Sequence, residues 1–243
     1  MRVRIICAVV AFLAGGLTTA QPAAPDSDAG VAPFSAHYIA EWKGISVGTS
    51  DLELARDVQP GQYIYKWTIS ARGIFRLVYS SDLTQQSWLK IVAGHVRPEK
   101  YRAAEGSSGV SLDFDWDGGH ARGMSENKPV DLPLQPGAQD LMSIQIEVML
   151  DLKNGNLPAL FHIVDKDEMK AFIYTQEGAA SLRTAIGRLD TVIVSSRRTG
   201  NDRILRMWFS PSLGFVPVQA ERWRNGKLEF AMRIKALNGQ KAQ

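Results

Sequence analysis

The sequence contains a single cysteine, Cys7, and that residue lies in an apolar stretch close to the N-terminus. The rest of the chain therefore has no residues for disulfide bonds, thiol catalysis or cysteine-based metal sites. An excess of one charge is lacking as well, because 28 Lys or Arg are nearly balanced by 25 Asp or Glu among 243 residues. Such a balance argues against a nucleic-acid-binding protein, which depends on a large basic surface.

Long apolar runs are absent beyond the N-terminus, where Met1–Ala20 has the features of a secretory signal peptide. Arg2 and Arg4 precede the apolar stretch Ile5–Leu17, and small residues follow it at Thr18–Ala20. The apolar stretch has thirteen residues, fewer than the roughly 20 that cross a bilayer. We therefore expect export, cleavage and a mature protein in the periplasm with no stable transmembrane segment. An uncleaved membrane anchor is the alternative.

Composition also predicts the domain boundaries. Gln21–Pro33 contains three prolines and no aromatic residue, which is typical of a flexible linker. Residues 34–237 are expected to form one β-rich domain, and residues 238–243 a short tail.

Alternating apolar and polar residues dominate this domain and predict half-buried β-strands. Asn225-Gly226 is typical of a tight hairpin turn, so we expect the strand after it to pair with Phe215–Trp223. Ile204–Phe209 and Leu189–Val194 are apolar on both faces, which indicates strands that are covered on both sides or that wrap a cavity. The clearest alternating runs are Phe34–Trp42, Tyr63–Ile69, Leu112–Trp116 and Leu228–Ile234.

One segment has helical spacing instead. Asp140–Lys153 places Leu141, Ile144, Val148 and Leu152 on one face, with Asp140 as the N-cap and Asn154-Gly155 as the stop. We therefore expect a mainly β protein, with a strongly bent antiparallel sheet or open β-barrel of about ten strands and one helix packed against it.

Gly44–Gly48 matches the Gly-x-Ser-x-Gly pattern of a hydrolase nucleophile elbow, with Ser46 as the nucleophile. An elbow requires a helix after the serine, whereas Thr49–Leu54 has the pattern of a strand. The glycines therefore indicate a tight turn or bend between two strands, and we expect no enzymatic activity; a serine hydrolase is the less favoured alternative.

Asp113, Asp115 and Asp117 begin like a calcium-binding loop, but Met124 stands where the loop requires its bidentate Glu. Because these aspartates alternate with apolar residues, they indicate the solvated face of a strand, and calcium binding stays open. No phosphate-binding loop is present, and the four histidines lack metal-ligand spacing, so we predict no cofactor and no metal.

Several short motifs together resemble an exported bacterial family known only as domain of unknown function 3108. The resemblance extends from Phe34 to Ile234 and implies a β-rich periplasmic protein of a Gram-negative envelope, with no catalytic residues to transfer. The family also looks distantly similar in shape to half-barrel carriers of periplasmic lipoproteins. The motifs are Phe34-x-Ala36-x-Tyr38, Trp42, Gly44-x-x-x-Gly48, Arg97-Pro98, Tyr101, Phe114-Asp115-Trp116, Asp140-x-x-Ser143 and Trp208-x-x-Pro211-x-x-Gly214-x-x-Pro217-Val218.

These observations together predict a non-enzymatic carrier for an amphipathic envelope component such as a lipid, lipoprotein or glycolipid. Aromatic residues would line an apolar concave face, the helix would close it, and arginines at the rim would meet an anionic head group. The alternative is an assembly or scaffold protein with a filled barrel that acts through protein–protein contacts. The expected ligand-binding residues are Tyr65, Trp67, Arg206, Trp208 and Arg222.

Overall fold

The computed structural model describes residues 30–78, 82–105 and 108–241. The expected signal peptide, with Cys7, and residues 21–29 of the expected linker lie outside the described residues. Among those described, two helices are present, α1 (Phe75–Val78) and α2 (Ser143–Asn154), with a 3-10 turn at Pro211–Leu213. The strands are β1 (Phe34–Trp42), β2 (Ile45–Arg56), β3 (Gln62–Ala71), β4 (Leu83–Val92), β5 (His95–Glu105), β6 (Ser108–Asp115), β7 (His120–Ser125), β8 (Lys128–Pro133), β9 (Gln139–Asp140), β10 (Leu160–Asp165), β11 (Glu168–Thr184), β12 (Gly187–Arg198), β13 (Arg203–Ser210), β14 (Val216–Arg224), β15 (Lys227–Leu237) and β16 (Gln240–Lys241).

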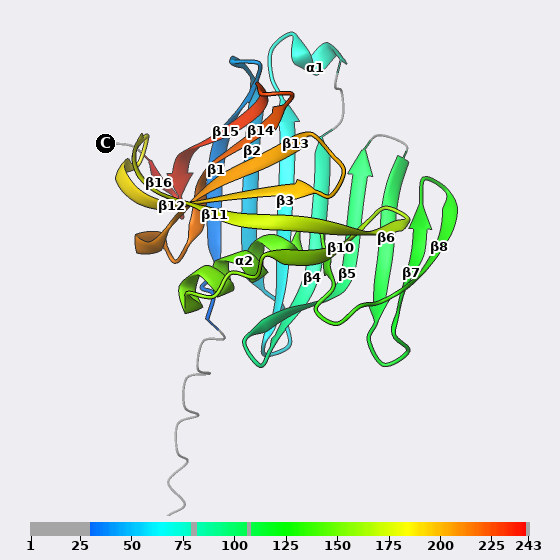
Figure 1. The fold of residues 1–243 in the computed structure, drawn as a ribbon. Helices are drawn as coiled ribbons and strands as arrows, with labels where there is room; N and C mark the ends of the chain where they lie inside the picture. The colour runs from blue at the N-terminus through cyan, green and yellow to red at the C-terminus, as the bar shows by residue number, and fades with distance from the viewer. Residues whose placement is uncertain (1–29, 79–81, 106–107, 242–243) are drawn as a thin grey trace, which may run out of the picture.

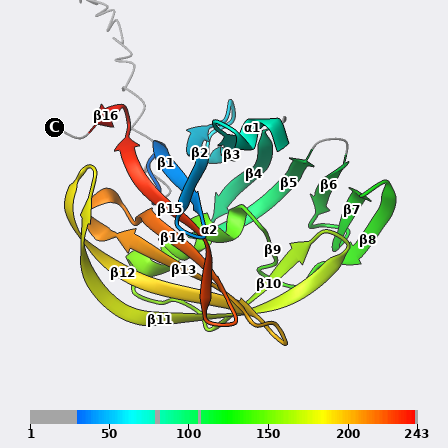
Figure 2. The same cartoon turned by 90° about the horizontal axis from the view of Figure 1, so that it is seen from above.

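All of these strands belong to one sheet. Its order is β8-β7-β6-β5-β4-β3-β2-β1-β15-β14-β13-β12-β11-β10-β9, and β16 pairs with β15. The two ends of this order, β8 and β9, are not paired with each other, so the sheet is open. Figure 2 shows it curling into an incomplete ring around α2, and Figure 1 shows β11 running across the more upright strands β3–β5. The prediction of a strongly bent, open antiparallel sheet is confirmed except at one edge, where β9 and β10 pair in parallel.

The predicted number of strands, about ten, was wrong, because fifteen strands form the continuous path. Alternation missed short strands such as β7 and β8, each of six residues. Gly123 interrupts the pattern in β7, and Pro129 and Pro133 interrupt it in β8. Prolines are tolerated in β8 because it is an edge strand, where a missing N–H leaves no ladder bond unmade.

The curl of the sheet has a local cause in its register shifts. A β-bulge puts an extra residue in one strand, bends that strand and increases its twist. Such shifts recur on both arms of the sheet and let one continuous sheet form two facing layers. They lie between His37 and Tyr38, Ala40 and Glu41, Trp88 and Leu89, Gln176 and Gly178, Trp208 and Phe209, and Arg222 and Trp223.

The core lies between these layers. In β1 the apolar side chains of Phe34, Ala36, Tyr38 and Ala40 are at most 5% exposed, as alternation predicts. Phe34, Ala36 and Tyr38 belong to one continuous apolar cluster that includes residues of α2 and of the opposite arm. Val31, within the expected linker, is buried in the same cluster.

Two turns lie where the sequence predicts them. Asn225 and Gly226 both have positive φ, 49° and 70°, and connect β14 to β15 as a tight hairpin. Lys43 and Gly44, with φ of 49° and 81°, connect β1 to β2. Ser46 is exposed on β2, with strand rather than helix after it, so the predicted turn between two strands is confirmed.

Gly48 is required by the close approach of β3 to β2. A Cβ atom at this position would lie 2.1 Å from the backbone oxygen of Ser70. The backbone cannot move away without breaking the pairing of Gly48 with Ala71.

Gly48→Ala is therefore expected to lower the free energy of unfolding by about 1–3 kcal/mol, the usual cost of forcing extra volume into a packed site. The matched control is Ser46→Ala, at an exposed position of the same strand, which should change it by less than about 0.5 kcal/mol. Urea unfolding measures both. Equal stabilities for the two variants would contradict the close approach.

Candidate functional site

Helix α2 begins with a buried reciprocal cap. Asp140 Oδ1 accepts hydrogen bonds from the backbone N–H groups of Met142 and Ser143, at 2.7 and 2.8 Å. Ser143 Oγ in turn accepts the N–H of Asp140 at 2.8 Å, which makes the arrangement reciprocal, as in a capping box. At the other end Gly155 adopts a left-handed conformation, with φ of 68°. The predicted helix and its stop are confirmed, whereas the helix starts at Ser143, with Met142 rather than Asp140 in the N-cap position, and Asp140 instead binds the turn that leads into the helix.

The same helix is joined to the inner face of the sheet by polar contacts. Ser87 Oγ of β4 donates to Asp140 Oδ2 at 2.6 Å. Gln145 Nε2 donates to the hydroxyl of Tyr65 on β3. Apolar residues on nearly every side of α2 are buried as well, as expected for a helix enclosed between two layers.

Burial shifts the pKa of the Asp140 carboxyl group. It raises the pKa of Asp140 from 3.8 to about 6, and the hydrogen bonds from Ser87, Ser143 and Met142 oppose that rise. Desolvation prevails because the carboxyl group is fully enclosed while each hydrogen bond offsets only part of the cost of its charge.

A hollow of about 170 Å³ lies beside the start of α2, and we call it the Trp67 hollow. Strands β3 to β6 and the turn before α2 form its walls, and Glu126, Asp165 and Lys166 lie at its rim. A shallower depression of about 400 Å³ lies on the opposite face of β4–β6, where Gln86, Arg102 and Ser111 alternate with the residues that line the hollow. The apolar side chains that line the Trp67 hollow are Trp67, Leu83, Tyr101, Val110 and Leu141.

The polar edges of the wall residues are already satisfied within the protein. Trp67 Nε1 donates to Ser50 Oγ at 2.6 Å, and the Tyr101 hydroxyl donates to Gln85 Oε1 at 2.9 Å. Burial raises the pKa of the Tyr101 hydroxyl well above its usual value, so it stays neutral. An apolar ligand segment would therefore enter the hollow without leaving these groups unpaired.

Of the residues expected to bind a ligand, Trp67 lies in the wall of the hollow, whereas Tyr65 is fully buried behind α2. Trp208 is only 8% exposed and packs in the core. The arginines have acidic partners: Arg206 contacts Glu177 at 2.6 Å. Ligand contact by these residues stays a prediction.

Arg222 has a distinct environment near one end of β14. Its guanidinium lies 5.7 Å from the ring centres of both Trp42 and Phe230, and 3.5 Å from Glu229. Burial lowers its pKa, although the charge of Glu229 opposes this. Arg222 thus has aromatic and acidic neighbours and does not line the Trp67 hollow.

The aspartates of the partial calcium pattern lie on or next to β6, as the solvated-face interpretation predicts. Asp113 pairs with Arg102 at 3.0 Å, and Asp115 pairs with Arg122 at 3.1 Å. Their carboxylates are thus directed to different arginines rather than to a shared centre.

Sequence reasoning missed most of the wall of the hollow. Leu83, Tyr101, Val110 and Leu141 come from four separate segments, and nothing in their local spacing indicates that they meet. Of these four residues, only Leu141 was singled out by the sequence, which placed it on the apolar face of the predicted helix. In the structure its side chain is 36% exposed.

The protein is thus an open, curled and mainly antiparallel sheet that encloses one helix. It leaves an apolar recess beside the start of that helix. The chain belongs to the family described as "Protein of unknown function (DUF3108)", whose sequence profile matches residues 35–230. The resemblance inferred from the short motifs is thereby confirmed. No curated protein matches the chain.

Two solved structures are similar to this chain. One, from Bacteroides fragilis NCTC 9343, is described as a candidate exported protein with a YmcC-like fold; it has 10% identity and a TM-score of 0.39, over 84% of this chain and 94% of that one. The other, a lipoprotein candidate from Parabacteroides distasonis ATCC 8503, has 8% identity and a TM-score of 0.36, over 86% and 96%. Likenesses at this level carry no argument about ligand, partner or location. Among the described residues, no helix is both long and apolar enough to cross a membrane.

The buried cap makes stability depend on pH in a defined direction. Because the pKa of Asp140 is higher in the folded protein, its contribution to the free energy of unfolding is greatest below pH 4 and is lost as the pH rises through 6. Asp140→Asn keeps the Oδ1 acceptor but does not titrate. We expect the variant to gain about 2.4 kcal/mol relative to the wild type between pH 4 and pH 7. Urea unfolding at these pH values checks this.

Asp202→Asn, at an exposed position, is the matched control and should follow the wild type. Comparison with the wild type isolates Asp140 because the other titrating groups remain in both proteins. Parallel curves for Asp140→Asn and wild type would contradict a buried, proton-binding cap.

Proposed function

We propose that the protein is a non-enzymatic periplasmic carrier for an amphipathic envelope component and that it takes part of an acyl chain into the Trp67 hollow. The observation that supports this is the recess itself, because its wall is apolar while the polar atoms of Trp67 and Tyr101 already have partners. Ligand sites are commonly apolar recesses with a few polar groups at the rim.

The size of the hollow sets the affinity that we expect. A typical ligand pocket has roughly 300–1,000 Å³, so 170 Å³ holds only part of an acyl chain. Each buried methylene contributes about 0.8 kcal/mol, so about ten of them would give micromolar affinity. We therefore expect weaker than micromolar affinity, with the rest of the chain outside the hollow.

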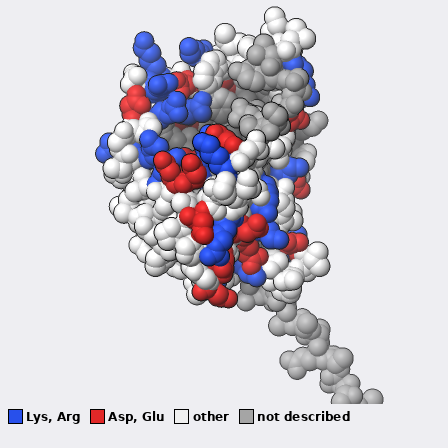
Figure 3. All heavy atoms as spheres, turned by 90° about the vertical axis from the view of Figure 1, so that its right-hand side faces the viewer, with Lys and Arg blue, Asp and Glu red and all other residues white. Residues whose placement is uncertain are grey.

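The rim supplies charge for a head group. Lys166 pairs with Glu126 there, and Asp165 lies beside it. Figure 3 shows basic and acidic side chains interleaved on the side of the molecule that carries β6–β8. A zwitterionic head group fits such a rim better than a purely anionic one, because both charges find a partner.

A second candidate is an assembly or scaffold protein that acts through protein–protein contacts. The filling of the interior by α2 favours it, because buried residues of the helix occupy the space between the layers that a larger ligand would need. In that case the hollow stays empty and the surface carries the function.

Native mass spectrometry of protein purified from periplasm without detergent tests the carrier function, with solvent extraction to identify any adduct. A sixteen-carbon lysophosphatidylethanolamine serves as the added probe. Leu141→Trp, which fills the floor of the hollow, should weaken uptake at least tenfold. Leu160→Trp is the matched control, since Leu160 is an exposed leucine on β10 that does not line the hollow, and its uptake should equal that of the wild type. A clean apo mass with no probe uptake would overturn the proposal and lead to crosslinking for partners.

Two tryptophans should respond differently to truncation. Trp67→Ala removes a wall of the hollow and is expected to weaken probe uptake while the protein stays folded. Trp208→Ala removes a core side chain and is expected to lower the free energy of unfolding by about 3–5 kcal/mol. Urea unfolding and probe titration on both variants check this. Wild-type uptake by folded Trp67→Ala would mean that the hollow is not the binding site.

A further inference from the structure

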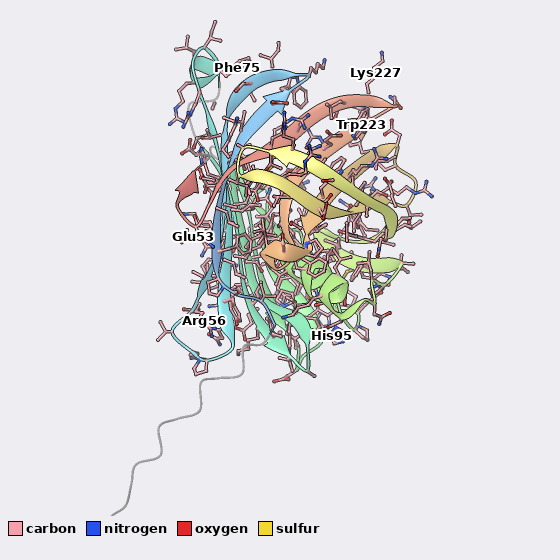
Figure 4. The ribbon with its side chains drawn as sticks, turned by 90° about the vertical axis from the view of Figure 1, so that its left-hand side faces the viewer. Glu53, Arg56, Phe75, His95, Trp223 and Lys227 are labelled. Carbon is pink, nitrogen blue, oxygen red and sulfur yellow. The ribbon has the colours of Figure 1, made fainter. Side chains whose placement is uncertain are left out.

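A cluster of a histidine and two carboxylates lies away from the Trp67 hollow. His95 begins β5 directly after the Ala93-Gly94 turn, and Figure 4 shows it at the opposite end of the molecule from Phe75 of α1. Glu147 and Asp151 are four residues apart on α2 and therefore lie on one face of the helix. One ligand atom from each of these three residues lies within 4.8 Å of the other two.

The contacts within the cluster leave one acceptor without a partner. His95 Nδ1 lies 2.8 Å from Glu147 Oε1, and the backbone N–H of Val96 donates to Glu147 Oε2 at 2.5 Å. Asp151 is only 5% exposed, and its buried Oδ2 has no hydrogen-bond partner among the residues that the structure describes. A buried, unpaired carboxylate oxygen is costly and calls for a compensating positive group.

The charges of this cluster also favour a bound cation. Burial and the adjacent Glu147 carboxylate raise the pKa of Asp151 to about 7, while the charge of His95 acts to lower it. Glu147 raises the pKa of His95. Asp151 also lies in the last turn of α2, where the helix dipole disfavours anions and favours cations.

We propose that His95, Glu147 and Asp151 bind a divalent first-row transition cation, and that zinc suits this donor set best. One imidazole nitrogen and two carboxylate oxygens are common zinc ligands, whereas the imidazole disfavours calcium and magnesium. Ligand atoms around tetrahedral zinc are about 3.4 Å apart, given bonds of about 2.1 Å. His95 Nδ1 and Glu147 Oε1 are 2.8 Å apart, so these two atoms must separate slightly to take an ion between them, and the 71% exposure of the His95 side chain leaves room for that movement.

The exposed side of His95 leaves the remaining coordination position to water. The two buried carboxylates are held by α2, and Glu147 is held also by the Val96 N–H, so the site is largely formed before the ion arrives.

Zinc titration of the purified protein by isothermal calorimetry tests the proposal. We expect one zinc ion per chain and micromolar or tighter affinity. His95→Gln and Asp151→Asn should each weaken binding at least tenfold. His95 is exposed, and Asp151→Asn removes an unpaired buried charge, so both variants should remain folded.

His120→Gln is the matched control, because His120 also pairs with a carboxylate, Asp131 at 2.5 Å, at another place on the surface. It should bind zinc like the wild type. No stoichiometric binding by the wild type, or binding that His95→Gln and Asp151→Asn leave unchanged, would overturn the proposal. The result is independent of acyl-chain uptake, since neither variant alters the lining of the Trp67 hollow.

Discussion

Helix α2 lies inside a curled sheet, so the polar atoms that it carries must find partners within the protein. Asp140 meets Ser87 of β4, Gln145 meets Tyr65 of β3, and Glu147 meets the backbone of β5. Each bond adds only about 1 kcal/mol net, but an unmade one costs about 1–3 kcal/mol. A slide of the helix along the sheet would break all three contacts together. They therefore fix its position, and with it the floor of the hollow and the carboxylates at the other end.

Local patterns predicted the parts of the fold that depend on local geometry. The alternation in β1, the Asn225-Gly226 hairpin and the stop of α2 each follow from a few neighbouring residues. Pairings across the chain do not, and β1 pairs with β15, nearly two hundred residues later. The strand count was underestimated for a related reason, since short edge strands such as β8 are defined by their neighbours rather than by their own alternation.

The candidate sites were harder to predict because the curl of the sheet decides which side chains meet. Trp67 was expected to contact a ligand from its aromatic character, but Tyr65, two residues away on the same face, lies behind α2. The sequence gives an even weaker indication of the cluster formed by His95, Glu147 and Asp151. Glu147 and Asp151 have helical spacing, yet an acidic pair on a helix is usually solvated, and His95 is 52 residues earlier than Glu147.

The two proposed sites share their supporting elements but remain physically separate. β4 starts at the hollow with Leu83 and ends at Val92, just before His95, and ten extended residues span roughly 30 Å. Substitutions that far apart usually have additive effects. Coupling would require α2 to move as a rigid body, and its buried contacts with β3, β4 and β5 oppose that motion. A cation near the end of α2 should therefore stabilise the enclosed helix without reshaping the recess beside its start.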